Sequence, residues 1–201
     1  MKIRRFLNMS TLVLATMLTV PITVVVRPLA AQPADTYQMI SIVSNNCLQP
    51  INQSMAAGAA IVQETCSTDV TDLAQRWTIV PVQWPYVHLV NWLSGMCLDA
   101  RGGAKNYTPA QQWPCNSITN ENWVYSPVGL SQKVPVYIYA GVSGSYNSDS
   151  RFCLDVPGGK KTSVLPVQIF KCNTTISQQW FGVFNAAPPG VNPDSRTSPR
   201  R

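Results

Sequence analysis

Short apolar runs, separated by Gly, Asn, Ser and Pro, make up most of the chain after residue 35. The runs at 38–43, 87–90 and 136–139 have the length and the flanking turn residues of β-strands. Outside the N-terminal segment no window keeps a helical period, and proline recurs too often for long helices. The pattern therefore predicts an all-β fold.

The strand-like runs fall into three similar blocks, at about residues 37–77, 88–123 and 137–180. Each block has a Cys-Leu pair, a second cysteine and a closing Gln-x-Trp or Glu-x-Trp. The closing residues Trp77, Trp123 and Trp180 are expected in the core. Three units that cannot each bury an apolar face alone predict a closed threefold barrel, the β-trefoil, over residues 36–186.

All six cysteines lie inside the blocks, two in each at nearly equal spacing. An even number in a small exported domain indicates disulfides rather than a metal site or a nucleophile. The pairing that keeps the symmetry of the repeats joins Cys47 to Cys66, Cys97 to Cys115 and Cys153 to Cys172. Each bond should stabilise the fold by about 3 kcal/mol.

Residues 1–31 have the layout of a secretory signal peptide, with basic residues first, then an apolar stretch, then small residues. Cleavage is expected near Ala31, which predicts a secreted or periplasmic protein without a stable membrane span. The alternative is an uncleaved anchor, because the apolar run approaches the roughly 20 residues that cross a bilayer.

The net positive charge of the chain becomes smaller once residues 1–31 are left out. The formal net charge is +6, but four of the 15 Lys and Arg residues lie within 1–31, so 11 remain against 9 acidic residues. Three more arginines lie in the Pro-rich tail at 187–201, which we expect to be disordered. A nearly neutral domain argues against a nucleic-acid partner.

The ordered motifs resemble the ricin-type lectin family, whose repeats combine Cys-Leu-Asp-Val, Gln-Leu-Trp-x-Cys-Asn and a closing Gln-x-Trp. The third block matches best, at 153–156, 168–173 and 178–180, and the resemblance covers about residues 36–184. It implies one shallow sugar pocket in each repeat. The Asp after Cys-Leu would accept hydrogen bonds from ring hydroxyls, and the aromatic residue two before the second cysteine would stack on a galactose-like sugar.

The resemblance assigns ligand residues to two of the repeats. The second repeat offers Asp99, Gln111, Trp113 and Asn120, with Glu121 in place of the usual Gln. The third offers Asp155, Gln168, Phe170 and Gln178, and should be weaker because Phe replaces Trp and Ser177 stands where Asn is common. The first has Gln49, Val62 and Glu64 at these positions, which predicts a lost pocket.

Simpler structural interpretations compete with these assignments. Trp113 and Phe170 could be packed against the disulfides, and Asp99 could bond its own turn beside Gly102 and Gly103. Trp84 and Trp92 lie outside the motifs and fit either an exposed aromatic patch or ordinary packing.

Two functions remain in competition, and neither needs a cofactor or a metal. The first is a secreted lectin for galactose-type or related glycans. The alternative is a cell-surface-binding accessory subunit, resembling the ricin-type subunits of cytolethal distending toxins, with a toxin or enzyme partner. An enzyme is not expected, because the chain has few carboxylates, a single histidine, His88, and no Gly-x-Ser-x-Gly element.

Overall fold

The computed structural model describes residues 35–185, except 70, 117, 127–134 and 142–150. The expected signal peptide and the C-terminal tail lie outside the described residues. Among the described residues, no helix is both long and apolar enough to cross a bilayer.

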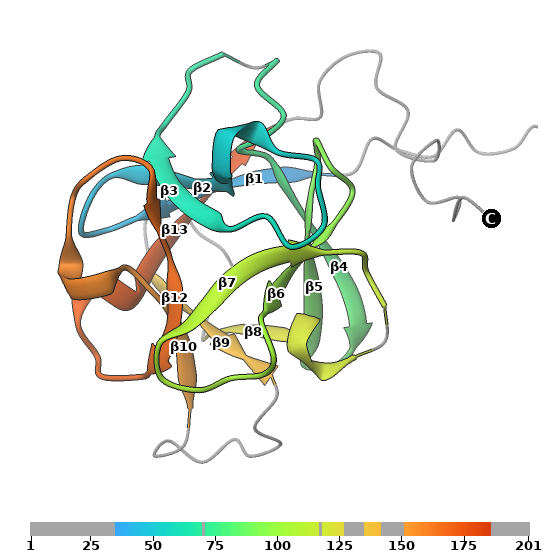
Figure 1. Cartoon of the computed structure of the whole chain (residues 1–201), viewed down its shortest axis with the longest axis vertical. Helices are drawn as coiled ribbons and strands as arrows, with labels where there is room; N and C mark the ends of the chain where they lie inside the picture. Colours follow the sequence, from blue (N-terminus) through green and yellow to red (C-terminus); the bar gives the residue numbers. More distant parts are fainter. Residues whose placement is uncertain (1–34, 70, 117, 127–134, 142–150, 186–201) are drawn as a thin grey trace, which may run out of the picture. The chain divides into compact units, whose positions relative to one another are not determined.

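Two strands from each repeat form a closed ring. They are β1 (Thr36–Ser41) and β4 (Trp77–Gln83), β5 (Tyr86–Asn91) and β8 (Trp123–Ser126), and β9 (Val136–Ala140) and β13 (Gln179–Asn185). The antiparallel pairs β4–β5, β8–β9 and β13–β1 join successive repeats. Within each repeat the first and last strands meet at the closing Trp, which pairs with Tyr37, Val87 or Val136. The ring confirms the predicted β-trefoil (Figure 1).

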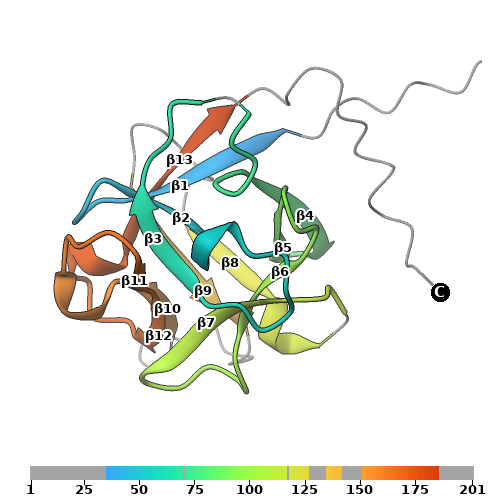
Figure 2. The ribbon, with the colours of Figure 1, turned by 45° about the horizontal axis from the view of Figure 1, so that its top comes forward.

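A hairpin from each repeat caps the ring. The hairpins are β2 (Asn46–Pro50) with β3 (Ile61–Thr65), β6 (Cys97–Ala100) with β7 (Thr108–Trp113), and β10 (Phe152–Asp155) with β12 (Gln168–Lys171), which the short β11 (Leu165–Pro166) precedes. The hairpins also pair with one another, β7 with β12 and β11 with β3 (Figure 2). Short 3-10 turns lie between strands: η1 (Ile51–Gln53), η2 (Thr119–Glu121), η5 (Pro157–Gly159) and η6 (Ile176–Gln178).

The three closing tryptophans form the centre of the core, as predicted, and each is fully buried. Their indole N–H groups donate to the carbonyl oxygen of the Leu in each Cys-Leu pair, at 2.9 Å in the first and second repeats and 3.1 Å in the third. These bonds tie each hairpin to the ring, and they satisfy polar groups that would otherwise be costly to bury.

The disulfides follow the predicted pairing. Cys47 bonds Cys66, Cys97 bonds Cys115, and Cys153 bonds Cys172. Each bond crosses its own hairpin, because the first cysteine lies in the first strand of the hairpin and the second lies just past the other strand. The structure also separates the two tryptophans outside the motifs: Trp92 is buried, whereas Trp84 is 89% exposed between β4 and β5.

Candidate functional site

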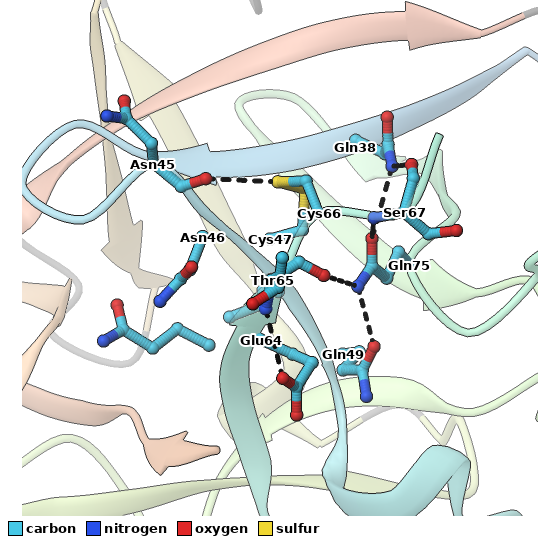
Figure 3. The surroundings of a disulfide bond; sticks show 12 residues. Gln38, Asn45, Asn46, Cys47, Gln49, Glu64, Thr65, Cys66, Ser67 and Gln75 are labelled. Carbon is cyan, nitrogen blue, oxygen red and sulfur yellow. Dashed lines mark hydrogen bonds between the residues drawn. A yellow bond between two sulfur atoms is a disulfide. The ribbon is translucent and has the colours of Figure 1, made fainter. Parts of the chain in front are cut away.

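The first residue of each closing motif clamps the loop that follows the second cysteine. The Gln75 side chain accepts a hydrogen bond from the backbone N–H of Ser67 at 2.8 Å and donates to the Thr65 carbonyl at 2.9 Å (Figure 3). In the third repeat, Gln178 makes the equivalent bonds to Asn173 and Lys171. The side chains are buried, so the clamp fixes this loop from inside the fold.

In the second repeat, the β6–β7 register brings the predicted carboxylate and amide together. Asp99 lies directly opposite Gln111, whose Nε2 donates to Oδ1 of Asp99 at 2.7 Å. The Asp99 bond therefore goes to the neighbouring strand rather than to the turn beside Gly102. Oε1 of Gln111 is buried and has no hydrogen-bond partner in the structure. This amide oxygen is therefore an unsatisfied acceptor beneath the surface of the second repeat.

Trp113 lies on the same face of β7 as Gln111, because side chains two apart on a strand point the same way. Its ring is 40% exposed, whereas Asp99 is only 2% exposed. The loop before β3 lies against this ring, since a methyl group added at Gly58 would be 3.6 Å from Cζ3 of Trp113. Oδ1 of Asn120 lies near Gly103, in the loop between β6 and β7. The structure thus pairs Asp99 with Gln111 and places Trp113 on the same face of β7 as Gln111.

Burial changes the ionisation of two carboxyl groups in this repeat. Desolvation raises the pKa of Asp99, while the Gln111 amide and the charge of Arg101 oppose the rise. Desolvation also raises the pKa of Glu121 to about 7, opposed by the Asn116 N–H and reinforced by the charge of Asp99. Oε1 of Glu121 is buried without a hydrogen-bond partner in the structure. Near neutral pH a large share of Glu121 is therefore protonated, and a protonated carboxyl resembles the amide found in the other repeats.

The third repeat repeats the same geometry. Asp155 lies opposite Gln168 in the β10–β12 register, and Nε2 of Gln168 donates to Oδ2 of Asp155 at 2.8 Å. Desolvation raises the pKa of Asp155, and hydrogen bonds from Gln168 and Gln178 oppose this. Phe170 is half-buried on the same face of β12. All of the predicted residues in this repeat therefore lie at one place.

The first repeat uses the same positions for contacts within the protein. Oε1 of Gln49 accepts a hydrogen bond from Gln75 at 2.9 Å, and Val62 is fully buried. Glu64, at the aromatic position, bonds the hydroxyl of Ser163 and the N–H of Thr65. These positions offer neither a free carboxylate nor an aromatic face. A hollow of about 350 Å³ lies instead beside the segment after Cys66, where Gln53, Ser67, Asp69 and residues 71–74 line it together with Leu93 of the second repeat.

Sequence reasoning missed the contributions that each repeat makes to the next. Gly58, from the first repeat, lies beside Trp113 of the second. Tyr107, from the second, packs edge to face against Phe170 of the third, with ring centroids 5.0 Å apart. Gly58 and Tyr107 occupy the same place in their repeats, just before the strand that leads to the second cysteine. An alignment of the three blocks shows that equivalence, but it does not show which neighbour the position faces.

His88 lies near the Cys97–Cys115 bond, and the three side chains come within 4.8 Å of one another. Both sulfur atoms are committed to the disulfide, so the group offers a metal one imidazole and no thiolate. Burial lowers the pKa of His88, and the ring bonds Oδ1 of Asn122 at 3.2 Å. These contacts indicate that His88 is neutral and has a structural role.

The sequence matches the model of the family described as "Ricin-type beta-trefoil lectin domain-like" at residues 28–113 and 73–137, which together span more than half of the chain. The protein belongs to the ricin-type β-trefoil lectin-like family. No curated protein matches the sequence.

Solved structures show the same fold. The designed threefold-symmetric protein ThreeFoil has a TM-score of 0.64 and 23% identity, covering 74% of this chain and 97% of that one. The exo-β-1,3-galactanase 1,3Gal43A of Clostridium thermocellum has a TM-score of 0.65 and 22% identity, covering 75% of this chain but 30% of the galactanase. The C-half of the earthworm R-type lectin, in complex with GalNAc, has a TM-score of 0.58 and 15% identity, covering 75% and 99%.

Proposed function

We propose that this protein is a secreted lectin that binds galactose-type glycans through its second and third repeats, without catalysing a reaction. The observation that carries the proposal is the Asp–Gln pair under an accessible aromatic ring, present in those two repeats and absent from the first. A carboxylate held by an amide accepts sugar hydroxyls in charge-assisted bonds, and the ring receives the C–H face of the sugar.

The neighbouring structures favour the same class of ligand. The earthworm lectin was solved with GalNAc, and the clostridial enzyme is named for its action on a β-1,3-galactan. Export is favoured by the leader-like residues 1–31 and by three disulfides, which persist in oxidising compartments. N-terminal sequencing of the product released by a secreting host should give a start near Gln32; retention of residue 1 would contradict cleavage.

The binding test starts with the full sequence expressed in a secreting host and the released protein titrated with galactose and lactose. Shallow single sites bind near the millimolar range, about −4 kcal/mol. Asp99→Asn and Asp155→Asn preserve side-chain shape and remove charge, so each should weaken its own site by roughly tenfold or more. Trp113→Ala should abolish the second site, whereas Trp84→Ala, which removes an exposed Trp in the turn between β4 and β5, is the matched control. Equal binding by all four variants would contradict the site assignment.

A second candidate function, an accessory subunit that docks on a toxin or enzyme, is favoured by the β4–β5 hairpin. Trp84 is 89% exposed there, and Val82 on β4 is 51% exposed. Exposed apolar groups gathered on one element are typical of protein contact surfaces. Under this function, glycan binding is absent, a defined partner subunit co-purifies with the protein from its native source, and Trp84→Ser releases that partner. Glycan binding without a partner supports the lectin instead.

A further inference from the structure

One equivalent position in each repeat lies at the junction with the following repeat. It is occupied by Gly58, Tyr107 and Val164, with positive φ angles of 80°, 65° and 58°. Gly58 faces Trp113, and Tyr107 faces Phe170. Next to Val164, Ser163 bonds Glu64 of the first repeat, which closes the cycle. Each candidate pocket is therefore bordered by a loop of the repeat before it, and only in the third repeat does that loop add a side-chain ring.

Tyr107 has a conformation and a location that core packing does not explain. A bulky side chain at positive φ is uncommon and strained, and the equivalent turn positions carry Gly58 and Val164, so an aromatic ring is present here only in the second repeat. Tyr107 is 72% exposed, and its ring meets that of Phe170 at an interplanar angle of 68°. The preceding residue fixes its loop to the third repeat, because Oδ1 of Asn106 accepts a hydrogen bond from the N–H of Lys171 at 2.8 Å. Tyr107 is thus held beside the third pocket rather than its own.

We propose that Tyr107 forms a subsite for a second sugar ring next to the third repeat's pocket, which makes this pocket selective for an oligosaccharide over a monosaccharide. The inference rests on the proposed function. Phe170 receives the terminal ring above Asp155, while the second ring contacts Tyr107. The inclined aromatic planes form a corner, which suits two linked sugars whose apolar faces point in different directions. The phenol hydroxyl adds a donor and acceptor for the second sugar.

The second pocket lacks this ring. Gly58 has no side chain, so no aromatic ring contacts Trp113 at the position where Tyr107 contacts Phe170 in the third repeat. That pocket therefore recognises a terminal sugar alone. The two pockets of one molecule consequently differ in the length of glycan that they read.

The test separates the two pockets by working in single-site backgrounds. With Trp113→Ala present, which abolishes the second site, only the third pocket reports, and we expect lactose to bind about three- to tenfold more tightly than galactose. Adding Tyr107→Ala should remove this preference while leaving the galactose affinity within about twofold. Val164→Ala, at the equivalent position facing the first repeat, is the matched control and should change neither affinity.

A gain-of-function arm uses the second pocket. With Asp155→Asn present, Gly58→Tyr should create a lactose preference there. The added Cβ meets Trp113 at ordinary contact distance, 3.6 Å, and although the positive φ of Gly58 strains a larger residue, Tyr107 already adopts a similar φ at the equivalent position. The melting temperature of Tyr107→Gly should be unchanged or higher, since glycine relieves the strained φ; a purely structural Tyr107 would lower it. If Tyr107→Ala affects galactose and lactose equally, or affects neither, the inference is wrong although the lectin function stands. If the unmodified protein binds neither sugar, the proposed function fails as well.

Discussion

The carboxylate of Glu121 accepts a hydrogen bond from the backbone N–H of Asn116 at 2.8 Å. Gln75 and Gln178 make the same contact in the other two repeats, and each uses its amide N–H for a second bond to a carbonyl oxygen. An ionised Glu121 has no proton for that second bond. The second repeat therefore contains a titrating group at the centre of an otherwise uncharged clamp.

Stability should fall as pH rises through the range where Glu121 ionises. Its pKa rises from the ordinary 4.5 to about 7 in the folded protein, so between these values the native state binds more protons than the unfolded state. The free energy of unfolding from this group is then highest below pH 4.5 and declines toward pH 7. Glu121→Gln should remove this decline and add about 1–2 kcal/mol at pH 8.

Urea unfolding at pH 5 and pH 8 measures that difference. Glu64→Gln makes the same change in the first repeat, where Glu64 is only partly buried, and should keep the pH dependence of the unmodified protein. An unaltered pH dependence in Glu121→Gln would show that Glu121 is ionised throughout this range.

The hydrogen bond from Trp123 Nε1 to the Leu98 carbonyl should stabilise the fold in addition to the packing of the Trp123 ring. Trp123→Phe removes the donor and leaves both a buried carbonyl oxygen and a small void. We expect a loss of about 2–4 kcal/mol in the free energy of unfolding. Thermal and urea denaturation measure this loss. Phe181→Leu, on the half-buried face of β13, is the control and should lose less.

Removing a disulfide should separate stability from binding. Replacing Cys47 and Cys66 with Ala opens a loop of sequence separation 19 and should cost about 3 kcal/mol. Galactose affinity should stay the same, because the first repeat has no Asp–aromatic pair. The same replacement at Cys97 and Cys115 should cost as much and also weaken the second pocket, since Trp113 lies beside Cys115. Equal affinity in both variants would mean that the hairpin holds Trp113 without its disulfide.

On acidification, sugar binding at the third pocket should weaken at a higher pH than it would with an aspartate of ordinary pKa. Burial raises the pKa of Asp155 above 3.8, and the protonated carboxyl loses its charge-assisted bonds to hydroxyls. In the Asp99→Asn background, affinity for lactose should therefore decrease on acidification before an exposed carboxyl would respond. Titrations from pH 7 to pH 4 test this, and Asp155→Asn should give a weak, pH-independent affinity.

Repetition in the sequence predicted the scaffold because each element there serves its own repeat. The disulfides stay within a hairpin, and each Trp bonds the Leu of its own Cys-Leu pair. The Asp–Gln contacts could also be predicted from the sequence, since Asp99 and Gln111 are directly opposed in one hairpin.

What the sequence could not predict depends on contacts between repeats. Nothing in the block containing Tyr107 indicates that its ring lies against Phe170, because that contact arises only when the hairpins meet. The depth of Asp99, 2% exposed, depends on packing from several segments. The burial of Arg76 could not be predicted either. Arg76 is 3% exposed and burial lowers its pKa, but its place between Gln75 and Trp77 in the sequence does not indicate burial.

The pairing of β1 with β13 places Thr36 opposite Asn185, so the two ends of the folded region lie side by side. A short linker could join them without moving either strand, and the chain could then be opened between other repeats. Because the ring closes by the same kind of strand pairing at every junction, no repeat has to be first. Circular permutation should therefore leave the barrel and its pockets intact.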